Sequence, residues 1–365
     1  MRHPLHSICP YFAVFPEDFV AKQIYAYTQL GDTVFDPFSG RGTTVFESLL
    51  NGRPAAGVDI NPVAACISGA KADPPTLTSI GRRLTSLESL QKKMSDFEAP
   101  QDDFFPACFH PRTLQQVLFL RDQLDWSNSR VDRFIAAVLL GCLHGESHKS
   151  RNCISNRMPR TISTNPDYSV RWWAKNGYTA PERDVFEVLK RVAAYRLRHS
   201  LPKLRGSVRC RDARRASCSF RKLRGSVSLI VTSPPYLNTT HYAEDQWLRL
   251  WFLGGPERPT AKAARDDRYR SPEQYWRFLA ESWSGCADLL KEDAVIVIRI
   301  GGTSLGKDDL LDGLRESLRT GLTNFDVYDM GASVTTEIKN RQTNAFRPGT
   351  TRKRYEHDFK VTLRR

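Results

Sequence analysis

The sequence, 365 residues long, predicts a doubly wound α/β fold. Two observations carry this prediction: short runs rich in Val, Ile and Phe recur along the chain, and segments with helical periodicity separate them. Several of the runs are apolar at nearly every position, which is typical of parallel strands that helices cover on both faces. We therefore expect one mostly parallel sheet between two layers of helices.

Seven strands are predicted in chain order. They cover residues 32–36, 55–60, 208–212, 227–232, 294–300, 325–330 and 359–363. The helical patterns expected to cover the sheet lie at 44–51, 272–291 and 308–320. β-Branched and aromatic residues favour the strand state, whereas apolar residues three and four positions apart favour amphipathic helices.

A long stretch between the second and third predicted strands breaks this rhythm. Connections in such units usually have about two to six residues, so this one must hold structure of its own. Helical patterns cover 114–124, 134–143 and 183–197, and the polar segment 147–178 is expected to be an exposed loop. We therefore divide the chain into a catalytic domain, residues 1–65 and 201–365, and a helical insertion between the second and third strands, residues 66–200.

The composition is basic. Lys and Arg number 54 against 40 Asp and Glu, so the formal net charge is +14 and the pI is near 9.5. Such an excess favours a polyanionic partner, because Lys and Arg that contact phosphates release bound counterions. Basic residues concentrate between Arg196 and Arg224. This basic run is either a solvated linker or a surface for phosphates, and both interpretations stay open.

The cysteines and the apolar segments indicate the compartment. The eight cysteines include no C-x-x-C pair, so neither a zinc site nor a disulfide framework is indicated. No secretory signal opens the chain, and the most apolar helical pattern, residues 134–143, is too short to cross a bilayer. We expect a soluble protein of the cytoplasm.

The segment "DPFSGRGTT", residues 36–44, forms a glycine-rich turn between the first strand and a helix. Gly40 and Gly42 allow a sharp turn and a close approach of the backbone to a ligand. The helix that Thr43 and Thr44 open presents free N–H groups at its start. Asp59 ends the second strand, where a carboxylate can accept hydrogen bonds from a ribose diol.

The residues around this turn favour one cofactor over others. A P-loop would need the G-x-x-x-x-G-K-[ST] pattern, which is absent. An acid directly before the turn, Asp36, disfavours a phosphate and suits a positively charged group. S-adenosylmethionine carries such a group and a ribose that Asp59 would hold. The alternative, a plain turn, accounts for Gly40 and Gly42 but not for two acids at matching strand ends.

A second motif, "TSPPY", follows the fourth predicted strand at residues 232–236. Open α/β sheets bind ligands at the carboxyl ends of their strands. Pro234 and Pro235 fix the backbone and leave rigid carbonyl acceptors, and Ser233 adds a hydroxyl. The Tyr236 ring offers a flat surface for stacking. The motif therefore suits a planar base with an exocyclic amine, although a Pro-Pro pair that only ends a strand is the simpler alternative.

Together, "DPFSGRGTT" and "TSPPY" resemble the DNA amino-methyltransferases, which methylate the N4 amine of cytosine or the N6 amine of adenine with S-adenosylmethionine. The resemblance covers residues 5–65 and 205–365, and it implies a Rossmann-like class I methyltransferase fold. A Ser version preceded by Thr is most similar to the N4-cytosine enzymes. N6-adenine methylation, RNA amino-methylation and a non-catalytic DNA-binding protein stay open as alternatives.

The resemblance implies site residues, carried over position by position. The catalytic set is Ser233, Pro234, Pro235 and Tyr236. The cofactor set is Phe15 and Pro16 of "YFAVFPEDFVAKQI", then Asp36, Pro37, Phe38, Gly40, Gly42, Thr43, Thr44, Asp59 and Ile60, and Asp212 of "VRCRDAR". The implied substrate is double-stranded DNA with the target base flipped out of the stack. The resemblance also implies a prokaryotic cell and leaves open a cognate restriction endonuclease as partner.

Two segments are expected to read the DNA. In the insertion the arginines with phosphate- and base-contacting chemistry are Arg151, Arg157, Arg160 and Arg171, although the insertion would also serve as a plain helical cap. The second segment, residues 332–356, contains Lys339, Arg341 and Arg347 and is alternatively a flexible hairpin.

Further side chains lie near these segments. Asn238 and His241 follow the TSPPY motif and are expected to line its pocket, whereas Trp247 and Trp251 are expected in the core. The pair His144 and His148 is interpreted as core or surface histidines, and no metal site is expected.

Overall fold

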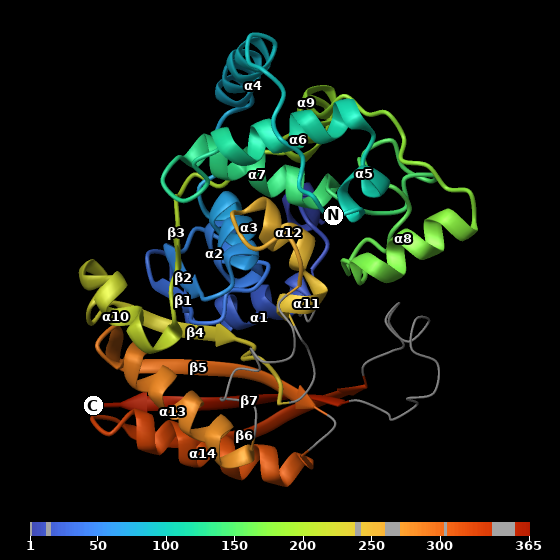
Figure 1. Ribbon diagram of the computed structural model, residues 1–365. Coiled ribbons are helices and arrows are strands. Elements are labelled where there is room, and N and C mark those ends of the chain that lie inside the picture. Colours follow the sequence, from blue (N-terminus) through green and yellow to red (C-terminus); the bar gives the residue numbers. More distant parts are fainter. Residues whose placement is uncertain (1, 12–15, 238–241, 260–270, 303–304, 338–354) are drawn as a thin grey trace.

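The computed structural model describes residues 2–11, 16–237, 242–259, 271–302, 305–337 and 355–365. Seven strands form one sheet in the order β3-β2-β1-β4-β5-β7-β6 (Figure 1). The strands are β1 (Thr33–Asp36), β2 (Ala55–Asp59), β3 (Ser207–Cys210), β4 (Val227–Thr232), β5 (Leu290–Gly302), β6 (Asp326–Glu337) and β7 (Tyr355–Arg364). Only β7 runs antiparallel to its neighbours, β5 and β6. The predicted Rossmann-like, mostly parallel sheet is confirmed.

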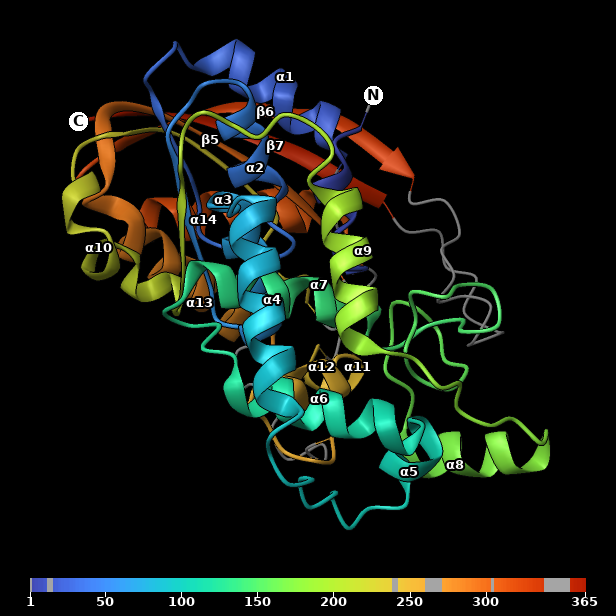
Figure 2. The ribbon, with the colours of Figure 1, turned by 90° about the horizontal axis from the view of Figure 1, so that it is seen from above.

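Helices cover both faces of this sheet (Figures 1 and 2). One face packs against α13 (Pro272–Ala287), α14 (Lys307–Gly321) and the short α10 (Ala216–Ser219), and the other against α1 (Glu17–Tyr27), α2 (Thr43–Leu50) and α3 (Pro62–Ala72). Strand β4 explains why both layers form: all six of its residues are buried, and Ile230 packs into one apolar cluster while Leu229 and Val231 pack into the other. A strand covered on both faces needs this continuous apolar pattern.

The insertion packs as helices beside the sheet and shares its core with the catalytic domain. Its helices are α4 (Leu77–Gln91), α5 (Phe104–Cys108), α6 (Pro111–Gln123), α7 (Arg130–Cys142), α8 (Pro166–Lys175) and α9 (Val185–Arg196). Their apolar cluster continues into the 3₁₀ turn Pro4–Ser7, α3 and α12 (Trp247–Phe252). Helix α3 crosses the predicted boundary at residue 66, so the division into two domains stays a prediction.

The prediction of an exposed loop over residues 147–178 is wrong for α8. Asn165 caps this helix, because its Oδ1 accepts a hydrogen bond from the Tyr168 N–H at 3.1 Å, and Pro166 occupies the first turn. Asn followed by Pro is a common start of a helix. The polar composition of the segment favoured a loop over a helix in the sequence prediction. Trp173 is the only large side chain of α8 that is buried.

Other expectations about the core are confirmed. Trp247 and Trp251 are buried. His144 is a buried histidine whose Nδ1 lies 2.8 Å from the Pro159 carbonyl and whose Nε2 lies 3.2 Å from Ser163 Oγ, and burial holds its pKa well below the usual value. Within the described residues, no helix is both long and apolar enough to cross a membrane.

Candidate functional site

The two sequence motifs meet at one edge of the sheet. Strands β1 and β4 are parallel neighbours, with Phe35 opposite Ile230, so the glycine turn and the TSPPY motif leave the sheet side by side at its carboxyl edge. The Thr232 hydroxyl donates a hydrogen bond to Asp36 Oδ1 at 2.6 Å. The Thr44 hydroxyl donates a second one to the Val231 carbonyl at 2.9 Å. The strand ends and the start of α2 therefore form one braced corner.

The glycine turn lies against β2. Gly40 and Gly42 have φ angles of +48° and +72°, which L side chains rarely adopt. The Ser39 N–H donates to the Val58 carbonyl at 3.0 Å, and the Gly40 N–H donates to Asp59 Oδ2 at 2.8 Å. These bonds hold the turn over the end of β2.

This contact depends on the absence of a side chain at Gly57. A Cβ there would lie 2.2 Å from Ser39 Oγ and 2.7 Å from the Asp36 carbonyl. We expect Gly57→Ala to push the turn away from β2, to destabilise the protein by about 1–3 kcal/mol and to weaken cofactor binding. Chemical denaturation and calorimetric titration measure the two effects.

Gly81→Ala is the matched control. Gly81 lies in α4, where an added Cβ would meet nothing within 4 Å. In a helix interior this change is expected to stabilise by about 0.5–1 kcal/mol and to leave cofactor binding unchanged. If both variants behave alike, the close approach of the turn to Gly57 does not matter.

The residues at the end of β2 and the start of α2 fit S-adenosylmethionine. Asp59 is half-buried, and its two oxygens accept from the Gly40 and Asn61 N–H groups, which leaves lone pairs for ribose hydroxyls. Burial raises the pKa of Asp59 to about 6. The adjacent Ile60 is 53% exposed at the carboxyl end of β2, so its apolar side chain is available to pack against a ligand there. Among the described residues Thr43 Oγ1 is buried and has no hydrogen-bond partner, so it can donate to a cofactor carboxylate.

Asp36 lies under the corner rather than on its surface. Its side chain is 1% exposed, and Oδ1 accepts from the Thr232 hydroxyl and from the Phe38 N–H at 3.0 Å. Burial raises its pKa to about 7, although these hydrogen bonds act in the opposite direction. In this position Asp36 joins the two motifs, a role that its place in the sequence alone did not reveal.

The TSPPY corner carries a chain of polar groups that ends on β7. Pro234 is buried, whereas Ser233 and Tyr236 are half-buried. Ser233 Oγ donates a long hydrogen bond of 3.4 Å to the Tyr236 hydroxyl, which donates to Glu356 Oε1 at 3.0 Å. Burial raises the pKa of Tyr236 well above its usual value. The contact with Glu356 fixes the direction in which the tyrosine ring points.

Sequence reasoning missed Glu356 and the ion pair beside it. Arg299 of β5 donates two hydrogen bonds to the Asp358 carboxylate, at 2.6 and 2.8 Å, and both side chains are buried. The guanidinium also lies 3.9 Å from the centre of the Phe19 ring. An arginine inside the apolar run "VIVIRIG" was the available signal, because a buried charge needs a partner.

The other predicted cofactor residues occupy varied positions. Pro16 is exposed at the start of α1, and Pro37 is buried in the turn. Phe38 makes edge-to-face contacts with Phe278 and Trp283. Asp212 follows β3 at the carboxyl edge and forms an ion pair with Arg214 at 2.7 Å.

The predicted DNA-contacting residues are only partly described. Arg151, Arg160 and Arg171 are exposed, and Arg157 is half-buried with its guanidinium 3.8 Å from the centre of the Tyr178 ring. Phe15 of the cofactor set, together with Asn238, His241, Lys339, Arg341 and Arg347, lies outside the described residues.

The sheet order and the braced corner define a class I, Rossmann-like methyltransferase fold. Residues 3–68 and 227–358 match the sequence profile of the N6/N4 methyltransferases, described as DNA methylases. The match covers more than half of the chain, and its gap contains nearly all of the helical insertion. The chain belongs to this family, which confirms S-adenosylmethionine as the cofactor.

Individual relatives match over short stretches. The type II methyltransferase M.MvaI of Kocuria varians is 36% identical over 62 residues, which is 17% of this chain and 14% of that protein. The orphan methyltransferase M.BamHII of Bacillus amyloliquefaciens is 43% identical over 49 residues, 13% of this chain and 18% of that protein. The matches thus span less than a fifth of either relative.

Among solved structures, the rRNA methyltransferase aviRa of Streptomyces viridochromogenes aligns with a TM-score of 0.35 and 13% identity, over 99% of this chain and 90% of that one.

Proposed function

We propose that this chain is a site-specific DNA methyltransferase that transfers a methyl group from S-adenosylmethionine to the exocyclic N4 amine of a cytosine flipped out of the duplex. The observation that carries the proposal is the hydrogen bond from Thr232 to Asp36. It joins the end of β4 to the end of β1. A base held at the TSPPY motif therefore lies beside a cofactor held at the glycine turn.

The glycine turn and the TSPPY motif have distinct roles in this reaction. When bound, S-adenosylmethionine supplies an electrophilic methyl group on a positively charged sulfur. Ser233 Oγ and the Pro234 carbonyl accept hydrogen bonds from the target amine and favour a nitrogen whose lone pair is available. Because Pro234 is buried and its φ is fixed, this acceptor needs no reorganisation during the reaction.

Tyr236 and Glu356 hold the base in this proposal. The tyrosine ring stacks on the flipped base, and the 3.0 Å hydrogen bond to Glu356 keeps the ring from rotating away. Fixing the stacking surface in advance lowers the entropy cost of ordering the base.

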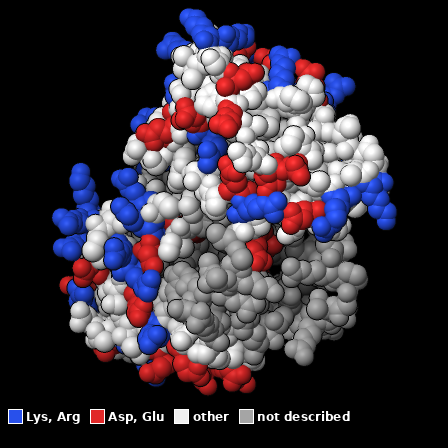
Figure 3. Space-filling model, viewed as in Figure 1, with Lys and Arg blue, Asp and Glu red and all other residues white. Residues whose placement is uncertain are grey.

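The basic run between Arg196 and Arg224 supplies a surface for the DNA backbone. Its exposed members near β3 and α10 are Arg209, Arg211, Arg214, Arg215, Arg221, Lys222 and Arg224. In Figure 3, Lys and Arg side chains gather over α10. Phosphate contacts of this kind strengthen binding without specifying sequence. A chain with this substrate works where the DNA is, as in the cytoplasm of a prokaryotic cell, either alone or beside a restriction endonuclease.

The N4 assignment is tested against N6-adenine methylation by mapping. The chain is expressed in a host without its own DNA methylation, and the genome is read by single-molecule sequencing. We expect N4-methylcytosine at one recognition sequence, and a much smaller fraction of marked sites in cells that express Ser233→Ala. If only methylated adenine is found, the target base is adenine rather than cytosine, and the protein is still a DNA methyltransferase. An unmarked genome, with folded protein that binds S-adenosylmethionine, would contradict methylation of DNA.

A further inference from the structure

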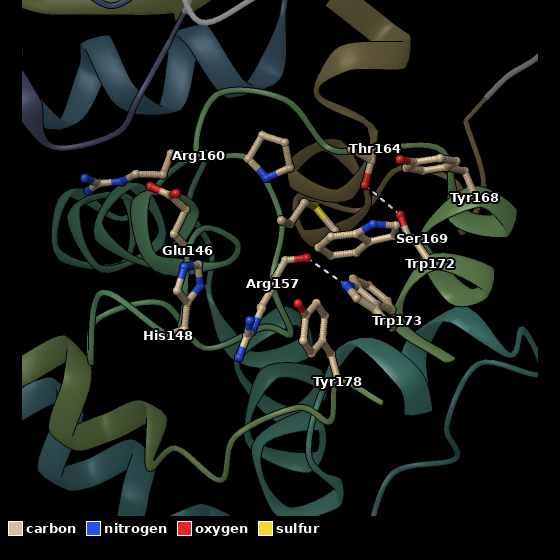
Figure 4. A pocket seen from close by; sticks show the side chains of 12 residues that line it. Glu146, His148, Arg157, Arg160, Thr164, Tyr168, Ser169, Trp172, Trp173 and Tyr178 are labelled. Carbon is tan, nitrogen blue, oxygen red and sulfur yellow. Dashed lines mark hydrogen bonds between the residues drawn. The ribbon is translucent and has the colours of Figure 1, made fainter. Parts of the chain in front are cut away.

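The insertion contains a cavity that the proposed reaction does not use. Its volume is about 320 Å³, within the range of sites that hold small organic molecules. The loop of residues 146–160 lines one side, and α8 with Tyr178 lines the other (Figure 4). The side chains that line it include Glu146, Arg157, Arg160, Thr164, Trp172 and Tyr178.

Hydrogen bonds of buried groups fix the residues that form the walls of this cavity. The Trp173 indole N–H donates to the Arg157 carbonyl at 2.7 Å, and the Arg157 N–H donates to Asn156 Oδ1 at 2.8 Å. Asn156 is 1% exposed, and its amide donates to the Tyr178 carbonyl at 3.0 Å. The loop and the tyrosine are thus fixed relative to each other, so the cavity is formed before any ligand arrives.

The side chains that face the cavity suit a flat ring. The Arg157 guanidinium lies 3.8 Å from the centre of the Tyr178 ring, and Trp172 meets the same ring edge-to-face at 5.2 Å. Trp172 is 37% exposed and Tyr168 is 53% exposed. Exposed aromatic rings beside an arginine are the usual elements of sites that stack nucleobases.

Polar groups at the rim match the edge of a base. The Glu146 carboxylate is held 2.5 Å from Lys149 Nζ, and this contact lowers its pKa, so it stays an acceptor for an exocyclic amine. On the other side, the buried Ser169 hydroxyl donates to the Asn165 carbonyl at 2.8 Å and lies 2.6 Å from Thr164 Oγ1, which keeps a lone pair to accept a hydrogen bond. Arg160 lines the cavity and is exposed, so it can reach a phosphate.

The cavity is tied to the catalytic half of the chain. The Gln246 amide donates to the Thr161 carbonyl at 2.7 Å, and the Trp247 indole N–H donates to the Thr164 carbonyl at 3.0 Å. Both residues lie in or beside α11 (Tyr242–Asp245) and α12, the helices that follow the TSPPY corner. In Figures 1 and 2, α8 lies toward the side to which β6 points, so the cavity lies toward the carboxyl edge of the sheet.

From this arrangement we propose that the insertion cavity binds a second DNA nucleotide that has left the base stack, with its base against Trp172, Tyr178 and Arg157 and its phosphate toward Arg160. The proposal rests on the proposed DNA substrate, and it gives the insertion a defined part in holding opened DNA.

The test measures affinity for single-stranded DNA of about 12 nucleotides by fluorescence anisotropy, against a matched strand in which the bases are replaced by abasic sites. All proteins carry Tyr236→Ala, which removes the stacking ring of the catalytic corner. We expect this background to prefer the strand with bases about tenfold, and Trp172→Ala and Arg157→Lys each to lose the preference. Arg157→Lys keeps the charge, so its affinity for the abasic strand should not change.

Tyr195→Ala is the matched control, because Tyr195 of α9 is 49% exposed and also contacts an arginine, Arg198, at 4.1 Å. It should retain the full preference. If Trp172→Ala behaves like Tyr195→Ala, the cavity does not hold a base. No step of this test needs methyl transfer, so a chain that marks the genome without a Trp172-dependent preference loses only the cavity proposal. A protein that prefers the strand with bases but methylates no site in the genome would contradict only the methylation proposal.

Discussion

Ser233→Ala is expected to slow methyl transfer by about 10²–10³-fold and to leave the affinity for S-adenosylmethionine unchanged. Removing one preorganised hydrogen-bond partner of a reacting group has an effect of this order. The Ser233 hydroxyl faces the target amine in our proposal, whereas the residues that fit the cofactor lie at the end of β2 and the start of α2. Single-turnover transfer of labelled methyl groups to DNA and calorimetric titration measure the two quantities separately.

Ser228→Ala is the control in the same strand. Ser228 lies near the opposite end of β4, where its hydroxyl donates to Asp32 Oδ1 at 2.9 Å. The substitution removes a partly buried hydroxyl and its hydrogen bond, as Ser233→Ala does, but far from the corner. It should keep the wild-type transfer rate. Equal rates in both variants would show that the hydroxyl of the TSPPY motif has no part in the reaction.

The sheet was predictable because its strands are covered on both faces. The prediction of residues 227–232 matches β4 to the residue, since all of its side chains are buried and the Pro-Pro pair ends it. At β5 the predicted helix 272–291 ran too far, because Lys291, Glu292 and Asp293 form a polar start to the strand. Periodicity alone cannot separate such a start from the end of a helix.

The parts of the candidate site that belong to the two sequence motifs were predictable. The turn, the two acids and the TSPPY corner follow from local sequence, and their meeting at one edge follows from the parallel pairing of β1 and β4. Glu356 and the Arg299–Asp358 pair lie far from either motif in the sequence, although they are close to the TSPPY motif in the fold. Their contacts depend on the antiparallel register of β7, which no local pattern reveals. The direct contact between Thr232 and Asp36 likewise required the fold.

Asp36→Asn is expected to remove much of the pH dependence of stability between pH 4 and 7. Burial raises the Asp36 pKa from about 4 to about 7, so the folded protein binds this proton more tightly than the unfolded chain does. The stabilisation is therefore complete below pH 4 and is lost as the pH rises through 7. The change corresponds to about 4 kcal/mol of unfolding free energy, which denaturation curves at several pH values measure.

The difference between wild type and variant isolates Asp36 from other groups that titrate in this range. Asp59, with a pKa of about 6, shifts stability in the same direction in both proteins, so the part of its contribution that does not depend on Asp36 cancels, whereas the repulsion by which the Asp59 charge raises the Asp36 pKa belongs to the measured difference. Asp122→Asn, at an exposed site on α6, should follow the wild-type curve. If Asp36→Asn also follows it, Asp36 carries its charge in the folded state, and the brace between the motifs is a charged carboxylate rather than a protonated one at neutral pH.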